Sequence, residues 1–393
     1  MGLYLPSIKY PPARPDEGFW NPITSTINWC EEDYYATIYS AEIINTLTNL
    51  LFIWLGVKGI RNCLRYGHDS IFVVSFCGYL LVGSGSFAFH STLKCRGPRR
   101  LEDTATDSCA DPMQLLDELS MIYTATIMCY ATFSFSQSRA VRILLGVGLA
   151  GLAVFITVCT APRARPNQST DQSQLYYHYL QDPDFHQNAF ALILIVIMAR
   201  STYVMEVNIR PTLKEKYGMK SRKSAASGPL TASERSANDR RDMEILRNMW
   251  LMVTLGLAIF LGGFGIWNLD NAFCSTIRRW RHQVGLPWGI VLEGHGWWHL
   301  MTGVGAYYYV VWAIWLRHCL NERQDEFVLS WPSIFSIPEV IPSAGAERKG
   351  SERTTDYVND HANGYTSGNK NAKANGNNGH ANIHGIREDR KSV

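Results

Sequence analysis

The sequence predicts an all-α, polytopic membrane protein, a bundle of seven transmembrane helices. Apolar runs of about 20 residues recur along the 393-residue chain, and a helix of that length crosses a ~30 Å hydrocarbon core. Trp and Tyr gather near the ends of these runs, as they do at membrane interfaces. The alternating pattern of a membrane β-barrel is missing. The seven expected spans are residues 34–57, 70–90, 114–135, 141–160, 185–204, 246–268 and 296–316.

Polar segments flank and interrupt these spans. The Ser-rich, basic residues 210–241 are expected to be disordered, as is the Asn-, Gly- and His-rich sequence from about residue 347 onward. The expected parts are a polar head (1–33), the catalytic bundle (34–318, with an inserted loop at 95–112 and a long basic loop at 206–245) and a C-terminal tail (319–393).

Composition excludes some functions. A formal net charge of +3, without a basic stripe that carries interleaved aromatic residues, argues against nucleic acid as a partner. The nine cysteines form no CxxC pair, so a structural zinc finger is not expected. Membrane lipids are the expected surroundings, and no obligate protein partner is indicated.

The positions of Lys and Arg near the span ends predict the orientation. Their bias favours a lumenal N-terminus and a cytosolic C-terminus. Asn167 begins a glycosylation acceptor pattern on the side that this orientation makes lumenal.

Two spans carry polar residues that lipid would not tolerate. In the first span, Glu42, Asn45 and Asn49 fall on one stripe of a helix and are expected to face the bundle interior. The fifth span contains Arg200.

Several residue types found at metal centres converge at one membrane face. His295 and His299 lie one helical turn apart, so both imidazoles can reach one ion. A catalytic zinc has three protein ligands, and His90, which closes the second span on the same face, is the natural third. Asp117, which opens the third span, is the acid–base candidate, and Ser86 lies one turn before His90 and can donate a hydrogen bond.

These residue types suit hydrolysis of a carbonyl compound. Zinc lowers the pKa of bound water from ~15.7 towards ~7. A carboxylate can take that proton and pass it to a leaving amine, while a hydroxyl and the metal stabilise the oxyanion. Plainer interpretations exist: a single span-end His is more often an interfacial residue, and Asp117 with Glu118 could complement a helix dipole. Their coincidence on one face favours a site that acts on a lipid.

The head contains a second candidate metal site. Asn28, Glu31 and Asp33 are closely spaced oxygen ligands, and Glu42 in the first span adds a distant carboxylate. Calcium takes 6–8 such oxygens. Taken alone, residues 28–33 are more typical of a solvated acidic patch. Glu42 changes that balance, because a carboxylate within a span needs a partner.

At these residues the sequence resembles the alkaline ceramidase family. The resemblance covers roughly residues 19–318 and implies a seven-span enzyme of the endoplasmic reticulum or Golgi that hydrolyses the amide of ceramides to a sphingoid base and a fatty acid. The matching stretches are Phe19–Pro22, Trp29–Glu32, Ala41–Glu42, Phe89–Lys94, Met113–Leu119, Phe185–Gln187, Trp267–Asn271 with Cys274, and His295–His299.

The resemblance also implies roles for individual residues. It implies a catalytic Asp117, a site Ser86 and a disulfide between Cys30 and Cys274. The implied zinc ligands are His90, His295 and His299, and the implied calcium ligands are Asn28, the Trp29 carbonyl, Glu31, Asp33 and Glu42.

The chain departs from the family at two places. Asn28 and Asp33 are exchanged relative to the family, which leaves the summed ligand charge unchanged. Nearly twenty polar residues between Cys95 and Pro112 are inserted, as a loop beside the active-site mouth or a retained intron. The resemblance to fungal members implies phytoceramide or dihydroceramide as substrate.

Two alternatives stay open at this point. One is a seven-span receptor of the progestin and adiponectin receptor type, which shares a zinc site of three His and one Asp. The other is a non-catalytic transporter or scaffold in which Glu42, Asp117 and Arg200 form structural ion pairs.

Overall fold

The structure, a computed structural model, describes residues 6–23, 25, 28–94, 112–160, 183–217 and 231–344, and these are mostly helical. Five helices are long and apolar enough to cross a membrane: Ile43–Tyr66, Ser70–Thr92, Arg139–Val158, Gln187–Ile209 and Ala232–Ala272. The elements are α1 (Ile43–Thr48), α2 (Leu50–Tyr66), α3 (Ser70–Thr92), α4 (Pro112–Phe133), α5 (Arg139–Thr160), α7 (Pro183–Ile209), α8 (Pro211–Lys216), α10 (Ala232–Ala272), α11 (Cys274–Val284), the 3₁₀ helix η1 (Trp288–Leu292), α12 (Gly294–Leu320), β1 (Phe327–Ser330) and β2 (Glu339–Pro342).

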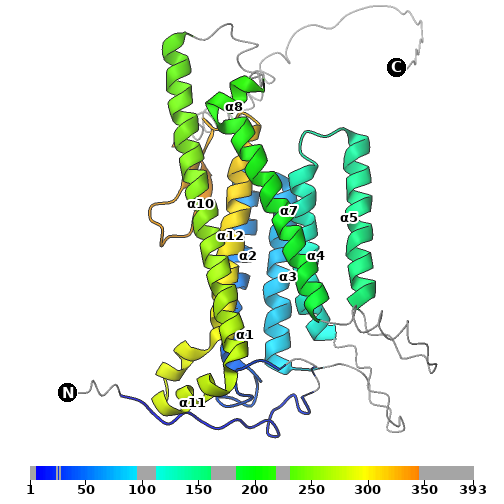
Figure 1. Ribbon diagram of the computed structural model, residues 1–393, viewed down its shortest axis with the longest axis vertical. Coiled ribbons are helices and arrows are strands. Elements are labelled where there is room, and N and C mark those ends of the chain that lie inside the picture. The colour runs from blue at the N-terminus through cyan, green and yellow to red at the C-terminus, as the bar shows by residue number, and fades with distance from the viewer. Residues whose placement is uncertain are drawn as a thin grey trace, which may run out of the picture. The chain divides into compact units, whose positions relative to one another are not determined.

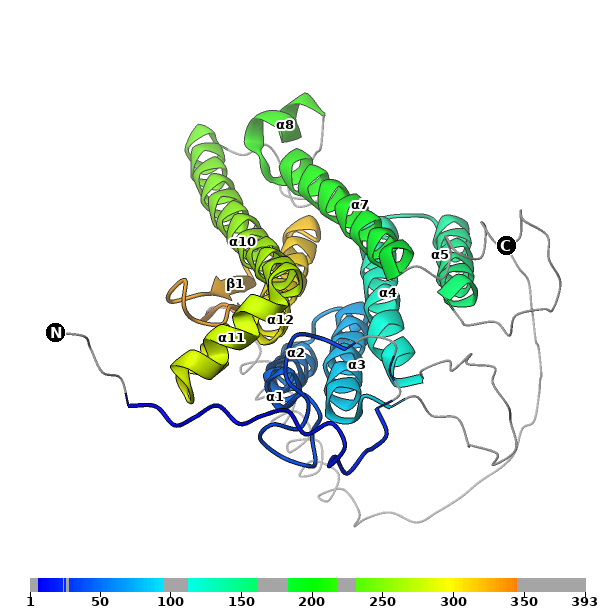
Figure 2. The same cartoon turned by 60° about the horizontal axis from the view of Figure 1, so that its bottom comes forward.

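The long helices pack side by side, with α12 among α1, α2, α3, α7 and α10 (Figures 1 and 2). α12 supplies many of the buried side chains, including Tyr307 and Trp312. α5 lies at the outer edge against α4, and its Leu144 is 73% exposed. An apolar helix surface of this kind is what a lipid-facing helix presents.

The first span begins later than the sequence predicts. Residues 34–42 are not helical, and Tyr34 has a φ of 53°. The Glu31 carboxylate accepts hydrogen bonds from the N–H groups of Ile44 and Asn45, at 2.7 and 2.8 Å, and so caps the helix there. Glu42 therefore lies just before α1 and not inside a span. The expectation that Glu42, Asn45 and Asn49 face the interior is confirmed, since all three are buried.

The prediction that residues 210–241 are disordered is wrong for the part that the structure describes. Pro211 starts the short helix α8, and α10 begins at Ala232. A capping box fixes this start: Thr231 accepts from the Glu234 N–H, and the Glu234 carboxylate accepts from the Thr231 N–H. Residues 218–230 lie outside the described part of the chain.

The C-terminal tail begins with regular structure that was not expected. α12 continues to Leu320, and β1 and β2 pair into a small hairpin. The ring of Phe327 on β1 stacks on His318, with centroids 3.8 Å apart, and Glu339 on β2 pairs with Lys58. The predicted disorder from residue 347, the inserted loop up to residue 111 and the Asn167 pattern lie outside the described residues.

Candidate metal centre

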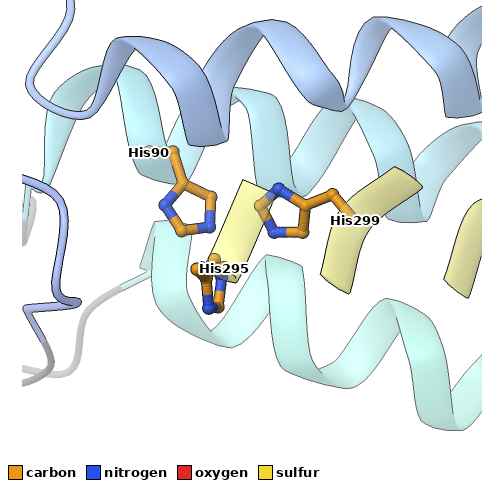
Figure 3. Close-up of side chains that lie close together, drawn as sticks. All are labelled: His90, His295 and His299. Atoms are coloured by element: carbon orange, nitrogen blue, oxygen red, sulfur yellow. The ribbon is translucent and has the colours of Figure 1, made fainter. Parts of the chain in front are cut away.

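Three buried histidines meet at one end of the bundle (Figure 3). His90 comes from the last turns of α3, and His295 and His299 from the first turns of α12. One ring nitrogen from each lies within 4.8 Å of the others. Nε2 of His90 and Nδ1 of His295 are buried, and neither has a hydrogen-bond partner among the residues that the structure describes. Buried imidazole nitrogens without partners are costly unless a ligand uses them, so the donor set fits a zinc ion.

Glu42 fixes the orientation of His90. Its carboxylate contacts Nδ1 of His90, and both side chains are fully buried. With the Nδ1 proton donated to the carboxylate, the lone pair of His90 lies on Nε2, the atom that faces the other two rings. A carboxylate behind a histidine ligand orients the ring in many zinc sites and makes it more basic.

The ring of His299 is oriented by residues of α1 and by Asn49, which lies between α1 and α2. Its Nδ1 lies 3.0 Å from the Asn45 carbonyl, 3.1 Å from Thr48 Oγ1 and 3.2 Å from Asn49 Nδ2. A carbonyl can only accept, so the Asn45 contact favours a proton on Nδ1. That tautomer leaves Nε2 of His299 to bind a metal.

The start of α12 is packed closely enough to set the position of His295. The Asp270 carboxylate, on α10, faces the backbone N–H groups of Gly294 and His295. A Cβ at Gly294 would lie 2.6 Å from the Asp270 Cβ, so only glycine fits there. The Trp29 ring stacks on His295, with centroids 4.4 Å apart.

Asp117 and Ser86 lie next to the triad. The Asp117 carboxylate on α4 lies beside the Ser86 hydroxyl on α3, and that hydroxyl accepts from Asn49 Nδ2 at 3.0 Å. Both residues line a cavity of about 320 Å³ with His295 and His299. The rest of its wall is mostly apolar and aromatic, drawn from α2, α3, α4, α7, α10 and α12, with Phe52, Met121, Phe260, Trp267 and Trp298 as examples. An acyl chain could lie in such a cavity beside the polar groups.

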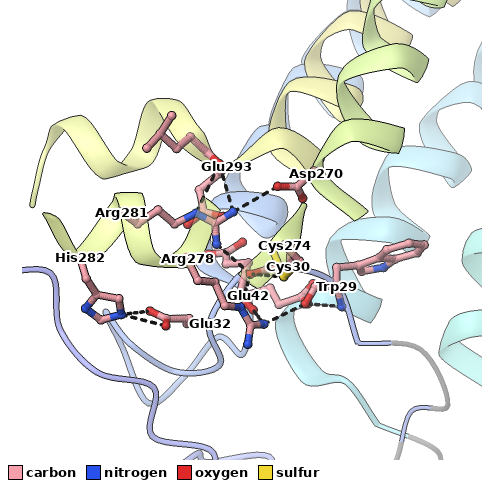
Figure 4. Close-up of a disulfide and its surroundings, with 12 residues drawn as sticks. Trp29, Cys30, Glu32, Glu42, Asp270, Cys274, Arg278, Arg281, His282 and Glu293 are labelled. Atoms are coloured by element: carbon pink, nitrogen blue, oxygen red, sulfur yellow. Dashed lines mark hydrogen bonds and ion pairs between the residues drawn. A yellow bond between two sulfur atoms is a disulfide. The ribbon is translucent and has the colours of Figure 1, made fainter. Parts of the chain in front are cut away.

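The N-terminal segment is tied to the same end by Cys30 and Cys274, which form a disulfide with Cα atoms 5.4 Å apart (Figure 4). Arg281 on α11 is fully buried and donates to the Cys30 carbonyl at 2.7 Å. It also pairs with Glu293 at 2.8 Å and Asp270 at 3.3 Å. Arg281 thus connects the disulfide to the residues that precede the histidine pair.

The five proposed calcium ligands lie near one another but are partly engaged. Asn28 bonds to Asp33 at 2.9 Å, and Glu42 accepts the Trp29 N–H at 3.1 Å. Asp33 Oδ1 is buried and has no hydrogen-bond partner in the structure. Both oxygens of Glu31, however, cap α1, and Arg278 donates to the Trp29 carbonyl at 3.2 Å. The oxygen donors suit calcium only if Arg278 gives up that carbonyl.

Burial explains why this end needs positive charge. Burial raises the pKa of Glu31 well above its usual value, and the carboxylates of Glu293 and Glu42 raise it further. The N–H groups of Ile44 and Asn45 lower the pKa of Glu31 in part. Arg281 pairs with Glu293, and Arg278 donates to the carbonyls of Trp29, Cys30 and Glu31.

Two further residues singled out from the sequence lie in different places. Glu118 lines the same cavity as Asp117. Arg200 lies in the wall of a different cavity, and no ion pair joins it to Glu42 or Asp117. The buried Arg281 and the Glu42–His90 contact were not anticipated.

Comparison with known proteins places this geometry in a family. The family model described as Ceramidase matches residues 21–341. The chain belongs to the ceramidase family. It is 27% identical to mouse alkaline ceramidase 3 over 334 residues, which are 84% of this chain and 98% of that protein. It is 32% identical to alkaline ceramidase YPC1 of Saccharomyces cerevisiae over 305 residues, 75% of this chain and 77% of that protein.

A plant relative matches more distantly: the alkaline ceramidase of Arabidopsis thaliana is 22% identical over 294 residues. The match to residues 21–341 includes the Trp29 segment, the three histidines and all of the hairpin except Pro342. Nothing in these matches favours a receptor or a scaffold.

Proposed function

We propose that the protein is a zinc-dependent alkaline ceramidase, which hydrolyses the amide bond of ceramides within the membrane. The observation that carries this proposal is the buried triad of His90, His295 and His299 beside Asp117, at the end of an apolar cavity. Family membership supplies the substrate class, because the relatives are named alkaline ceramidases. By the resemblance to fungal members, phytoceramide and dihydroceramide are the preferred substrates.

Different residues of the site have different roles in amide hydrolysis. A zinc ion on the three histidines supplies Lewis acidity, which polarises a carbonyl and lowers the pKa of nearby water. The Asp117 carboxylate takes a proton from the attacking water and returns it to the nitrogen of the leaving sphingoid base as the C–N bond breaks. The Ser86 hydroxyl, itself held by Asn49, donates to the Asp117 carboxylate and orients it. Once Asp117 has taken the proton, the Ser86 hydroxyl is free to donate to the oxyanion.

The bundle itself is proposed to have seven spans. The two further spans are α4 and α12, which are 22 and 27 residues long and carry Asp117 and the histidine pair. The bias of Lys and Arg supports a lumenal N-terminus and a cytosolic C-terminus, in the endoplasmic reticulum or Golgi.

The decisive experiment is mass spectrometry of a ceramide panel incubated with the purified protein. Release of a sphingoid base and an equal amount of fatty acid, lost with a zinc chelator and restored by zinc, is expected. Intact ceramides throughout, in a folded protein that contains zinc, would favour the receptor alternative. A protein without zinc in which His295→Ala changes nothing would favour the scaffold.

We also propose that Asn28, the Trp29 carbonyl, Glu31, Asp33 and Glu42 hold calcium. Asp33 is the residue to test, because Glu42 also holds His90. Asp33→Asn should shift the calcium concentration that gives half-maximal stabilisation upward by at least tenfold. A melting temperature that does not respond to calcium in the wild-type protein would show that Arg278 alone supplies the charge there.

A further inference from the structure

A second cavity lies at the other end of the helices that carry the triad. It measures about 710 Å³ and lies between α3, α4, α7 and α12. Arg317, on its wall, is separated from His299 on the same helix by about 27 Å of rise. That distance is close to the ~30 Å thickness of a hydrocarbon core, so in the proposed seven-span bundle the two cavities lie in opposite leaflets. No residue lines both cavities.

The wall of this cavity contains Arg200, a charged residue within an apolar helix that the proposed reaction does not use. Arg200 lies within the apolar helix α7, and its Nε is buried without a hydrogen-bond partner among the described residues. Its guanidinium lies over the rings of Phe133 and Tyr203, at 5.7 and 5.8 Å. The structure shows no ion pair for Arg200 with any residue that it describes. A charge within a span normally faces a partner or a functional site.

A second guanidinium stands in the same wall. Arg317 is held by Asp69 at 3.2 Å and by the Ala131 carbonyl at 2.6 Å, and it lies 4.6 Å from the Phe135 ring. Arg317 is thus fixed in place, while no carboxylate in the described part of the chain forms an ion pair with Arg200. One acidic residue, Glu322, also lines the cavity.

The rest of the cavity wall includes hydroxyl groups and apolar side chains. Hydroxyls of Thr132 and Ser201 provide further hydrogen-bonding groups. Phe72, Met128 and Leu316 provide apolar surface towards the middle of the bundle. Guanidinium groups bind the oxygens of phosphate and carboxylate through two parallel hydrogen bonds, and an apolar wall accepts an acyl chain.

We propose that this cavity binds an anionic amphiphile, with its phosphate on Arg200 and Arg317 and its acyl chain along the apolar wall. This does not depend on the reaction at the triad. In the proposed orientation the cavity opens on the cytosolic side, whose leaflet carries the anionic lipids.

The test uses the full-length protein, purified in a neutral detergent, with phosphatidic acid as the probe. Phosphatidic acid should raise the melting temperature of the wild-type protein, and native mass spectrometry should show one retained lipid. Diacylglycerol with the same acyl chains lacks the phosphate and should do neither. Inorganic phosphate distinguishes the source: full protection by phosphate alone would assign the site to a soluble oxyanion.

Arg200→Gln should abolish the shift and lower lipid retention at least tenfold, while Arg61→Gln should change neither. Arg61 is an exposed arginine near the same end of the bundle, on α2, and does not line the cavity. If Arg200→Gln folds poorly, Arg200→Lys is the second variant. It keeps the positive charge but cannot form two parallel hydrogen bonds to a phosphate, so the lipid should raise its melting temperature by an intermediate amount. Wild-type retention in both Arg200 variants would overturn the proposal. Hydrolysis by Arg200→Gln in neutral micelles should stay at the wild-type level.

Discussion

The histidines of the triad are positioned by residues that lie far from them in the chain. Glu42 holds His90, Asn45 holds His299, and Asp270 faces the backbone at His295. A zinc site depends on such contacts because a ring that is free to rotate loses affinity for the metal.

Asp117→Asn tests the division between metal binding and proton transfer. The variant keeps the shape of the side chain but cannot take a proton, so hydrolysis should fall by about 10²–10⁴-fold. Zinc content, measured by elemental analysis of the purified protein, should stay equal to the wild-type content. Loss of zinc together with activity would make Asp117 a structural residue.

Glu42→Gln tests the orientation of His90. The amide can still accept a hydrogen bond, but it lacks the charge that makes His90 more basic. Zinc affinity should fall by about 10–100-fold, measured by competition with a chromogenic chelator. Glu32→Gln is the matched control, since its carboxylate contacts His282, which belongs to neither proposed metal site. Equal zinc affinity in Glu42→Gln and the control would contradict this role.

The spacing of His295 and His299 could be interpreted from the sequence because one helical turn brings both to one side. His90 required only that the spans alternate in direction. The partners of these rings could not be derived in this way: the Glu42–His90 contact depends on how the segment before α1 folds over α3. Its meaning became visible only in three dimensions.

At the scale of elements, the start of α12 depends on close packing against α10. A methyl group at Gly294 would overlap the Asp270 side chain, which in turn pairs with Arg281. Helix propensity favours alanine over glycine by about 1 kcal/mol, so a loss on substitution would report the steric overlap and not the backbone.

Gly294→Ala should therefore lower hydrolysis by at least tenfold and reduce zinc content, because His295 is the next residue. Gly265→Ala on α10 is the matched control, since a Cβ there would meet nothing within 4 Å. Both are measured as turnover and zinc per purified protein. Similar behaviour of the two variants would show that α12 can shift without loss of the site.

Element boundaries were predicted less well than element types. The sequence contains the capping-box pattern, Thr231 followed three residues later by Glu234. The high charge and serine content around it favoured a prediction of disorder instead. The later start of α1 was not visible, because its cap is Glu31, a residue distant from the helix start. Caps supplied by distant side chains leave no local pattern.

At the scale of the whole molecule, the family match and the described structure end almost together. The match stops at residue 341 and β2 at Pro342. The hairpin packs on the end of α12 through Phe327 and on α2 through the Lys58–Glu339 pair. We expect the hairpin to contribute to stability and the sequence after it to contribute little.

Two truncations separate these parts. A chain that ends at residue 344 should keep its melting temperature and turnover. A chain that ends at residue 326 exposes His318 and loses the buried Phe327, so its free energy of unfolding should fall by about 3–5 kcal/mol. Thermal unfolding in detergent measures both. Equal melting temperatures would mean that the hairpin is dispensable.

The segment that carries Trp29 has a consequence for both the cavity and the first helix. Its ring lies on His295 and lines the cavity, yet it belongs to a non-helical segment held by the Cys30–Cys274 disulfide. Part of the wall of this cavity is therefore built outside the bundle, by a segment that one covalent bond attaches to the start of α11. The same segment caps α1 through Glu31, so a change in how it is attached would reach both the cavity and the start of the first helix.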